Sequence, residues 1–144
     1  MKVSAAANIS PARIARDLAD VNRFGATAAG GAERLAWTDD EVAARRWLSE
    51  ACVDLGLDVE QDEAGNVWAH PPEARGVYLG SHRDTVPDGG RFDGALGVIG
   101  ALEVLRSARE ANRPEARRLG LVCFTDEEGA RFGIGMLGSR SLAE

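Results

Sequence analysis

Two apolar runs of strand length, separated by a helical segment, limit the possible folds of this chain most. Residues 76–80 (GVYLG) and 118–124 (RLGLVCF) are short and apolar, as buried strands are. Between them, residues 95–111 carry Val98 and Leu102 at helical spacing. A strand, a helix and a strand in this order form a crossover unit with parallel strands. The sequence therefore predicts an α/β fold, with a mainly parallel central sheet flanked by helices.

Two helices are expected before these strands. Ser10 followed by Pro11 is typical of an N-cap and a first helical residue. Thr38 and Glu41 have the spacing of a capping box, in which each side chain binds the backbone N–H of the other residue. The helix that begins there is expected to end at Gly56.

A hairpin is expected next, formed by residues 57–61 and 67–69 around a turn rich in Asp, Gly and Asn. His70 precedes two prolines and is interpreted as a loop residue. A last helix is expected to begin near Ser139.

Composition excludes several classes of protein. The 144 residues suffice for one domain with a core, and the net charge of −6 does not favour nucleic acid as a partner. No apolar run is long enough to span a membrane, and the N-terminus has no sustained apolar segment, so a cytoplasmic location is expected. Cys52 and Cys123 are expected to be buried free thiols.

Ionisable side chains follow both predicted core strands. His82, Asp84 and Asp93 come after the first strand, and Glu127 and Glu128 come after the second, next to a further aspartate. Since ligands of open α/β sheets bind beyond the carboxyl ends of the strands, we expect the two clusters to share one edge.

These residue types fit a metal site. Asp84 lies two positions from His82, so it can hydrogen-bond one imidazole nitrogen and leave the other free for a metal. Asp93 precedes a glycine and could bridge two cations. Of Glu127 and Glu128, one could bind metal and the other accept a proton from water. Alone, each pattern is more often a surface hydrogen bond, a turn or a solvated face; their combination after apolar strands favours the metal site.

Four stretches resemble a known family. They are GSHRDTVPDGGRFDGALGV (80–98), FTDEEGARFGIGMLGSRSL (124–142), VNRFGATAAGGAERLAWTDDEVAARRWL (21–48) and DEAGNVWA (62–69). They are similar to the N-carbamoyl-L-amino-acid hydrolase, β-ureidopropionase and allantoate amidohydrolase branch of the aminoacylase–carboxypeptidase metallohydrolases. The resemblance implies a zinc-peptidase-like catalytic domain and a dinuclear hydrolase of linear amides, acting on small ureido or carbamoyl compounds.

The resemblance also implies a role for each site residue. His82 would bind the first metal, Asp84 would orient His82, and Asp93 would bridge both metals, with a cis peptide bond to the next residue in many members. Glu127 would be the general base and Glu128 a ligand of the second metal. Zinc or manganese suits such ligands, and cobalt or nickel could replace them. Arg83 stands where the family usually has a neutral residue, and we expect it to point away from the metals.

The same resemblance implies that residues 1–144 are the N-terminal part of the catalytic domain. In the family, one further ligand for each metal and a lid or dimerisation domain lie beyond this part, and the complete enzymes are homodimers. Three hypotheses therefore stay open: a metal-dependent amidohydrolase, with this chain alone inactive; a non-catalytic fragment or partner-dependent subunit; and a dipeptidase or aminoacylase.

Overall fold

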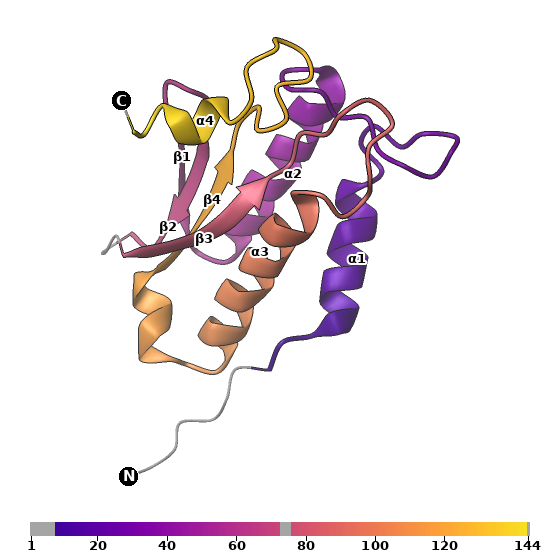
Figure 1. Ribbon diagram of the computed structural model, residues 1–144. Coiled ribbons are helices and arrows are strands. Elements are labelled where there is room, and N and C mark those ends of the chain that lie inside the picture. The colour runs from indigo at the N-terminus through magenta and orange to yellow at the C-terminus, as the bar shows by residue number, and fades with distance from the viewer. Residues whose placement is uncertain (1–7, 73–75, 144) are drawn as a thin grey trace.

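The protein has an α/β fold, as expected from the sequence (Figure 1). The computed structural model describes residues 8–72 and 76–143. The elements within these ranges are, in chain order, α1 (Pro11–Val21), α2 (Asp39–Asp54), β1 (Asp58–Gln61), β2 (Val67–His70), β3 (Val77–His82), α3 (Ala95–Glu110), the 3-10 helix η1 (Pro114–Arg118), β4 (Leu119–Phe124) and α4 (Leu137–Arg140).

The sheet is mixed, with the strand order β1-β2-β4-β3 in the described part of the chain. β3 and β4 are parallel, and their register places His82 opposite Phe124. β1 and β2 form the expected antiparallel hairpin, and β2 is also antiparallel to β4. The expectation of a mainly parallel sheet is therefore correct only for the β3–β4 crossover unit. A short hairpin turn forces antiparallel pairing, and only the long connection through α3 permits parallel strands.

β3 lies at the edge of this sheet rather than in its interior. Among the described strands it pairs only with β4, and Val77 at its start is 58% exposed. The prediction of a buried strand at residues 76–80 was wrong, because an apolar run does not reveal how many neighbours a strand has. His70 lies at the end of β2, not in a loop, and its Nε2 is 3.7 Å from a carboxylate oxygen of Glu60.

The core lies between α2, α3 and one face of the sheet, while α1 packs against α3 (Figure 1). The opposite face of the sheet carries edge-to-face contacts of Trp68 with Tyr78 and with Phe124. The buried core members from the two helices and the sheet include Leu48, Cys52, Val67, Ala69, Leu102, Leu105, Leu121 and Cys123. Both cysteines are free and buried, as expected, and burial raises the pKa of Cys52 to about 12.

Both predicted N-cap hydrogen bonds form, but the reciprocal bond of the predicted capping box does not. Oγ of Ser10 accepts a hydrogen bond from the backbone N–H of Arg13 at 3.3 Å. Oγ1 of Thr38 accepts from the backbone N–H of Glu41 at 3.4 Å. The Glu41 carboxylate, however, accepts from the backbone N–H of Trp37 at 3.1 Å instead of that of Thr38. The same carboxylate also binds two arginines, which hold it away from the position of a reciprocal capping box.

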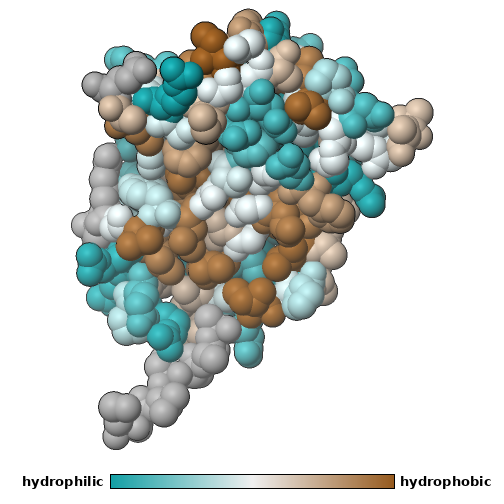
Figure 2. Space-filling model, viewed as in Figure 1, coloured by the Kyte–Doolittle hydropathy of each residue, from teal (hydrophilic) through white to brown (hydrophobic). Residues whose placement is uncertain are grey.

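Apolar side chains reach the surface at several places, and Figure 2 shows them between polar ones on one face of the molecule. The most exposed include Val77, Phe92, Phe132, Met136 and Leu142. No helix in the described residues has the length and apolar character needed to cross a membrane.

Candidate metal centre

The loops after β3 and β4 bring the predicted ligands together. His82 is the last residue of β3, and residues 126–128 follow β4, its parallel neighbour. One ligand atom each of His82, Asp93 and Glu128 lies within 4.8 Å of the other two. The expectation that both clusters share one edge of the sheet is therefore confirmed.

The two ring nitrogens of His82 face different surroundings. Nδ1 lies 3.1 Å from the backbone carbonyl oxygen of Asp84 and 3.6 Å from its carboxylate. Nε2 lies 3.7 Å from Oδ1 of Asp93 and 3.6 Å from Oε2 of Glu127. Burial lowers the pKa of His82, but the hydrogen bonding and charge of Asp84 and the charge of Glu127 outweigh it, so the pKa is raised overall. With the proton on Nδ1, the Nε2 lone pair faces the acidic side chains.

The buried carboxylate of Asp84 joins the two loops. Its Oδ1 accepts a hydrogen bond from the backbone N–H of Glu127 at 3.2 Å, and its Oδ2 from that of Glu128 at 3.1 Å. These bonds turn the carboxylate toward the loop after β4, and Nδ1 of His82 lies nearer to the carbonyl oxygen of Asp84 than to its carboxylate. Burial raises the pKa of Asp84, yet the interactions with His82 and the two backbone N–H groups lower it overall. Asp84 therefore stays ionised and holds both loops.

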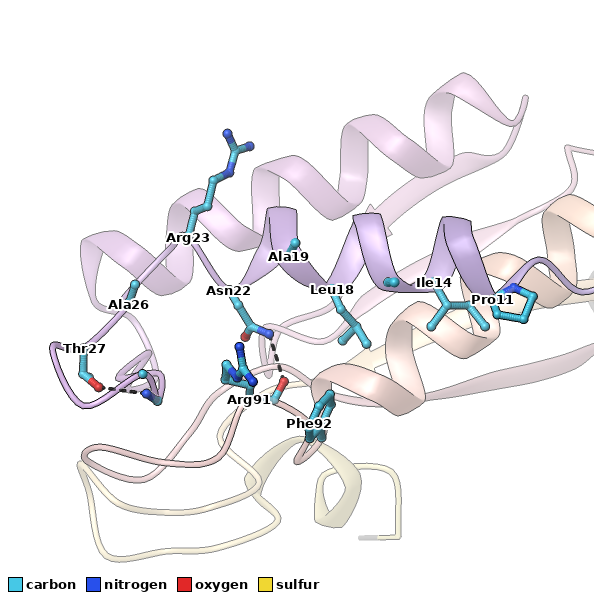
Figure 3. A pocket seen from close by; sticks show the side chains of 13 residues that line it. Pro11, Ile14, Leu18, Ala19, Asn22, Arg23, Ala26, Thr27, Arg91 and Phe92 are labelled. Atoms are coloured by element: carbon cyan, nitrogen blue, oxygen red, sulfur yellow. Dashed lines mark hydrogen bonds between the residues drawn. The ribbon is translucent and has the colours of Figure 1, made fainter.

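The turn that carries Asp93 lies against the His82 ring. Gly94 has a φ of 63°, in the left-handed region, and a Cβ there would lie 2.5 Å from atoms of the imidazole. Glycine is the residue that fits this approach. The peptide bond between Asp93 and Gly94 is trans, so the cis bond implied by the resemblance is absent. Asn22, at the end of α1, donates to the carbonyl oxygen of Arg91 at 3.0 Å and ties this turn to the helix (Figure 3).

Negative charge accumulates around the open side of His82. The side chain of Asp93 is 69% exposed and that of Glu127 is 39% exposed. Burial and the charge of Asp93 raise the pKa of Glu128, with smaller effects of Glu127 and Asp84. Such crowding of carboxylates is relieved when a cation binds between them.

Asp126 behaves differently from its two neighbours. It is 1% exposed, its φ is 50°, and its Oδ2 has no hydrogen-bond partner in the described residues. Burial and the charge of Asp84 raise its pKa. Of the acidic run after β4, the structure therefore directs only Glu127 and Glu128 to the open side of His82.

Arg83 points away from the cluster, as expected. Its guanidinium is buried and donates to a carboxylate oxygen of Glu41 and to Sγ of Cys123, the latter at 3.0 Å. Residues 82 and 83 alternate across the strand, so the imidazole faces the carboxylates while the guanidinium enters the core under α2. Glu41 neutralises this buried cation.

Arg34 is a supporting residue that sequence reasoning missed. It is fully buried, and its Nε donates to the backbone carbonyl oxygen of Arg83 at 3.1 Å. Its backbone pairs with Thr85, since the Thr85 N–H donates to the Arg34 carbonyl oxygen at 3.0 Å. These bonds fix the loop on both sides of Asp84. A single arginine in a loop carries no local signal of burial, because arginine is normally exposed.

The donor set fits a divalent cation. One imidazole and two carboxylates are ligands that zinc and manganese accept. Two ligands of one zinc ion lie at most about 4.2 Å apart, twice a zinc–oxygen bond, so small side-chain rotations would bring these groups into coordination. An α/β sheet with such a donor cluster beyond its parallel strands is typical of a metal-binding α/β protein.

Comparison with known proteins identifies the family. The model of Peptidase family M28 matches residues 66–144, more than half of the chain, and the chain belongs to this family. Family and candidate site together indicate dependence on divalent metal. N-carbamoyl-L-amino acid amidohydrolase of Geobacillus stearothermophilus is 38% identical over 135 residues, which are 91% of this chain and 33% of that protein. Ureidoglycolate hydrolase of Arabidopsis thaliana is 39% identical over 114 residues, 76% of this chain and 24% of that protein.

A solved structure agrees with these relatives. The hydantoinase/carbamoylase family amidase of Burkholderia ambifaria superposes with a TM-score of 0.87 at 45% identity, over 92% of this chain and 34% of that chain. The resemblance to the carbamoylase branch is thereby confirmed. The chain spans about a third of the length of these relatives.

Proposed function

We propose that this chain carries part of the active site of a metal-dependent amidohydrolase that cleaves the C–N bonds of linear carbamoyl or ureido compounds. The observation that carries the proposal is the cluster of His82, Asp93 and Glu128, with Glu127 beside it, in a chain similar to hydrolases of such bonds. The substrate is a small molecule; neither nucleic acid nor membrane is proposed as a partner.

We assign the metal ligands as follows. His82 and Asp93 would hold a first divalent ion, and Asp93 and Glu128 would hold a second. Zinc or manganese suits these donors, and cobalt or nickel could substitute. Bound ions supply Lewis acidity, which polarises an amide carbonyl and favours the ionisation of water. A catalytic ion usually has three protein ligands, so the complete protein supplies one more to each ion.

Glu127 is the group that we assign to proton transfer. Its carboxylate is partly exposed and lies 3.6 Å from Nε2 of His82, beside the proposed ligands. It accepts a proton from water during attack on the carbonyl and returns it to the leaving nitrogen. Asp84 acts through other groups, because it contacts His82 and holds the backbone of Glu127 and Glu128.

The similar proteins favour two substrate classes. N-carbamoyl-L-amino acids are the first candidates, since several relatives are amidohydrolases of these compounds. Ureidoglycolate is the second, because the plant relatives are ureidoglycolate hydrolases. Dipeptides and N-acyl amino acids are the alternatives within the wider family. The complete protein is proposed to be a cytoplasmic homodimer.

The test combines metal analysis with turnover. We expect two divalent ions per chain in the complete protein and hydrolysis of an N-carbamoyl amino acid or of ureidoglycolate, measured as ammonia release. Glu127→Gln should lower kcat by about 10²-fold or more and leave the metal content unchanged. Glu63→Gln, at an exposed position in the turn before β2, is the matched control and should retain activity.

Failure to hold metal or to hydrolyse any of the four substrate types would contradict the proposal. Turnover that appears only with a second chain would support the alternative, a partner-dependent subunit. Hydrolysis of dipeptides or N-acetyl amino acids alone would identify the dipeptidase or aminoacylase alternative.

A further inference from the structure

A cavity lined by arginines lies at the far end of α3 from the candidate metal centre. α3 begins at Ala95, two residues after Asp93, and its 16 residues span roughly 24 Å. The cavity has a volume of about 860 Å³ and opens between the end of α3, η1 and the residues that follow β2. Its lining residues are Pro71, Pro72, Arg109, Asn112, Arg113, Pro114, Ala116 and Arg117.

The charges in this cavity are not balanced. Arg113 pairs with Glu115 at 3.1 Å, which accounts for one cation. In the described part of the chain, neither Arg109 nor Arg117 has a carboxylate within ion-pair distance. Among the described residues that line the cavity, none is acidic. This described lining therefore carries net positive charge, although the chain as a whole carries a net charge of −6.

Arg109 is the most informative of the three. It is partly buried, and its Nε is enclosed without a hydrogen-bond partner among the described residues. Burial lowers the pKa of Arg109, as expected for a cation without an anionic partner. The C-terminal end of α3 attracts a cation in its last turn, which explains one arginine at this place. It does not explain why Arg117, from η1, lines the same cavity.

We propose that this cavity binds a small oxyanion, a phosphate or carboxylate group, through Arg109, Arg117 and Arg113. A guanidinium group has N–H donors in a planar fork that matches two oxygens of such an anion. Pro71, Pro72 and Pro114 restrict the backbone of the walls, so little ordering is needed when the anion binds. The site is separate from the proposed metal centre, and its existence does not depend on the hydrolase proposal.

The test is a titration of metal-free protein with inorganic phosphate, in which calorimetry measures the heat of binding at constant ionic strength. A titration with chloride serves as the comparison. We expect saturable binding of one phosphate per chain. Arg117→Gln should weaken binding about tenfold or more, since hydrogen bonds to charged groups are strong, and Arg109→Gln should act likewise. Arg117 is exposed, so its variant tests the site without disturbing the core. Arg46→Gln, at an exposed position on α2, is the control and should bind phosphate normally.

Succinate forms the second arm of the experiment. Competition between succinate and phosphate would indicate a site for oxyanions in general, whereas binding of succinate alone would assign the site to carboxylates. The proposal is overturned if neither anion binds saturably, or if the arginine variants bind as tightly as the unchanged protein. In a separate experiment, the same variants loaded with metal should take up as much metal as the unchanged protein, which keeps this result independent of the metal centre.

Discussion

At the scale of single residues, Asp84 has more contacts in the site than its sequence pattern indicates. The spacing to His82 predicts one contact, with the imidazole. The structure adds two hydrogen bonds, in which each carboxylate oxygen accepts from a different backbone N–H, those of Glu127 and Glu128. Three of the proposed functional groups thus depend on one buried carboxylate.

Replacing Asp84 by asparagine tests this arrangement. The amide has one acceptor oxygen, so one of the two backbone N–H groups loses its partner and the charge beside His82 disappears. We expect metal affinity to fall about 10- to 100-fold, the range typical for partners of metal ligands. Competition with a coloured chelator measures this affinity. Asp58→Asn, exposed on β1, should bind metal like the unchanged protein; equal affinity of both variants would contradict the assignment of Asp84.

At the scale of elements, Glu103 joins α1 to α3. Its buried carboxylate accepts from the backbone N–H of Ser10 at 2.8 Å and from Nε of Arg13 at 2.9 Å. Ser107 and Arg106, on α3 itself, donate to it at 2.9 and 3.1 Å. Burial raises the pKa of Glu103, but these donors outweigh it and lower the pKa to about 2. The position of α1 therefore depends on a charged group inside the helical layer.

The lowered pKa predicts how stability depends on pH. The ordinary pKa of glutamate is higher than that of folded Glu103, so the unfolded chain takes up the proton first. The contribution of Glu103 is complete at neutral pH and is lost as the pH falls from about 4.5 toward 2. At pH 7, Glu103→Gln should lower the free energy of unfolding by roughly 2–3 kcal/mol, measured by urea denaturation.

The difference between the two proteins should shrink as the pH is lowered through this window. Glu115→Gln, an exposed residue of η1, is the control and should change stability little. A difference that is the same at pH 7 and pH 3 would show that the ionisation of Glu103 has no part in holding α1.

At the scale of the whole molecule, the core is buried between helices and sheet, but one strand edge and several apolar side chains are exposed. α2 and α3 cover one face of the sheet, whereas β3 has one unpaired edge among the described strands and apolar side chains near the site are exposed. Phe92 precedes Asp93, and Phe132 contacts Trp37 at 5.6 Å between ring centroids. Exposed apolar groups of this kind mark surfaces of interaction. A metal ion that binds the folded chain but not the unfolded chain links stability to metal binding.

Metal should therefore stabilise the folded protein as a whole. Zinc or manganese at 100 times its dissociation constant stabilises the folded state by about 2.7 kcal/mol, which corresponds to a rise in Tm of roughly 5–10 °C. His82→Ala should remove this rise, because it removes a proposed ligand. His70→Ala, the change of the chain's other histidine, should keep it. Thermal unfolding followed by circular dichroism measures both, and a metal effect that survives in His82→Ala would contradict the assignment.

Local patterns were sufficient for the α-helices and strands, though not for η1, and for the choice of candidate ligands. The caps at Ser10 and Thr38, the hairpin and the helix after Asp93 follow from residue types at short spacing. The crossover unit also brought His82 and Glu128 to one edge of the sheet, since parallel neighbours end on the same side.

What the sequence alone determined, then, is the α/β class, the helix and strand segments and the family resemblance, because these depend on side chains close together in the chain. Only the tertiary structure decided the strand order, the edge position of β3, and the partners of Asp84, Arg34 and Glu103. Those contacts join residues far apart in sequence, and no local periodicity encodes which distant group meets a buried charge. The physical reason is that a buried charge needs a partner, whereas its own chemistry does not specify where in the chain that partner lies.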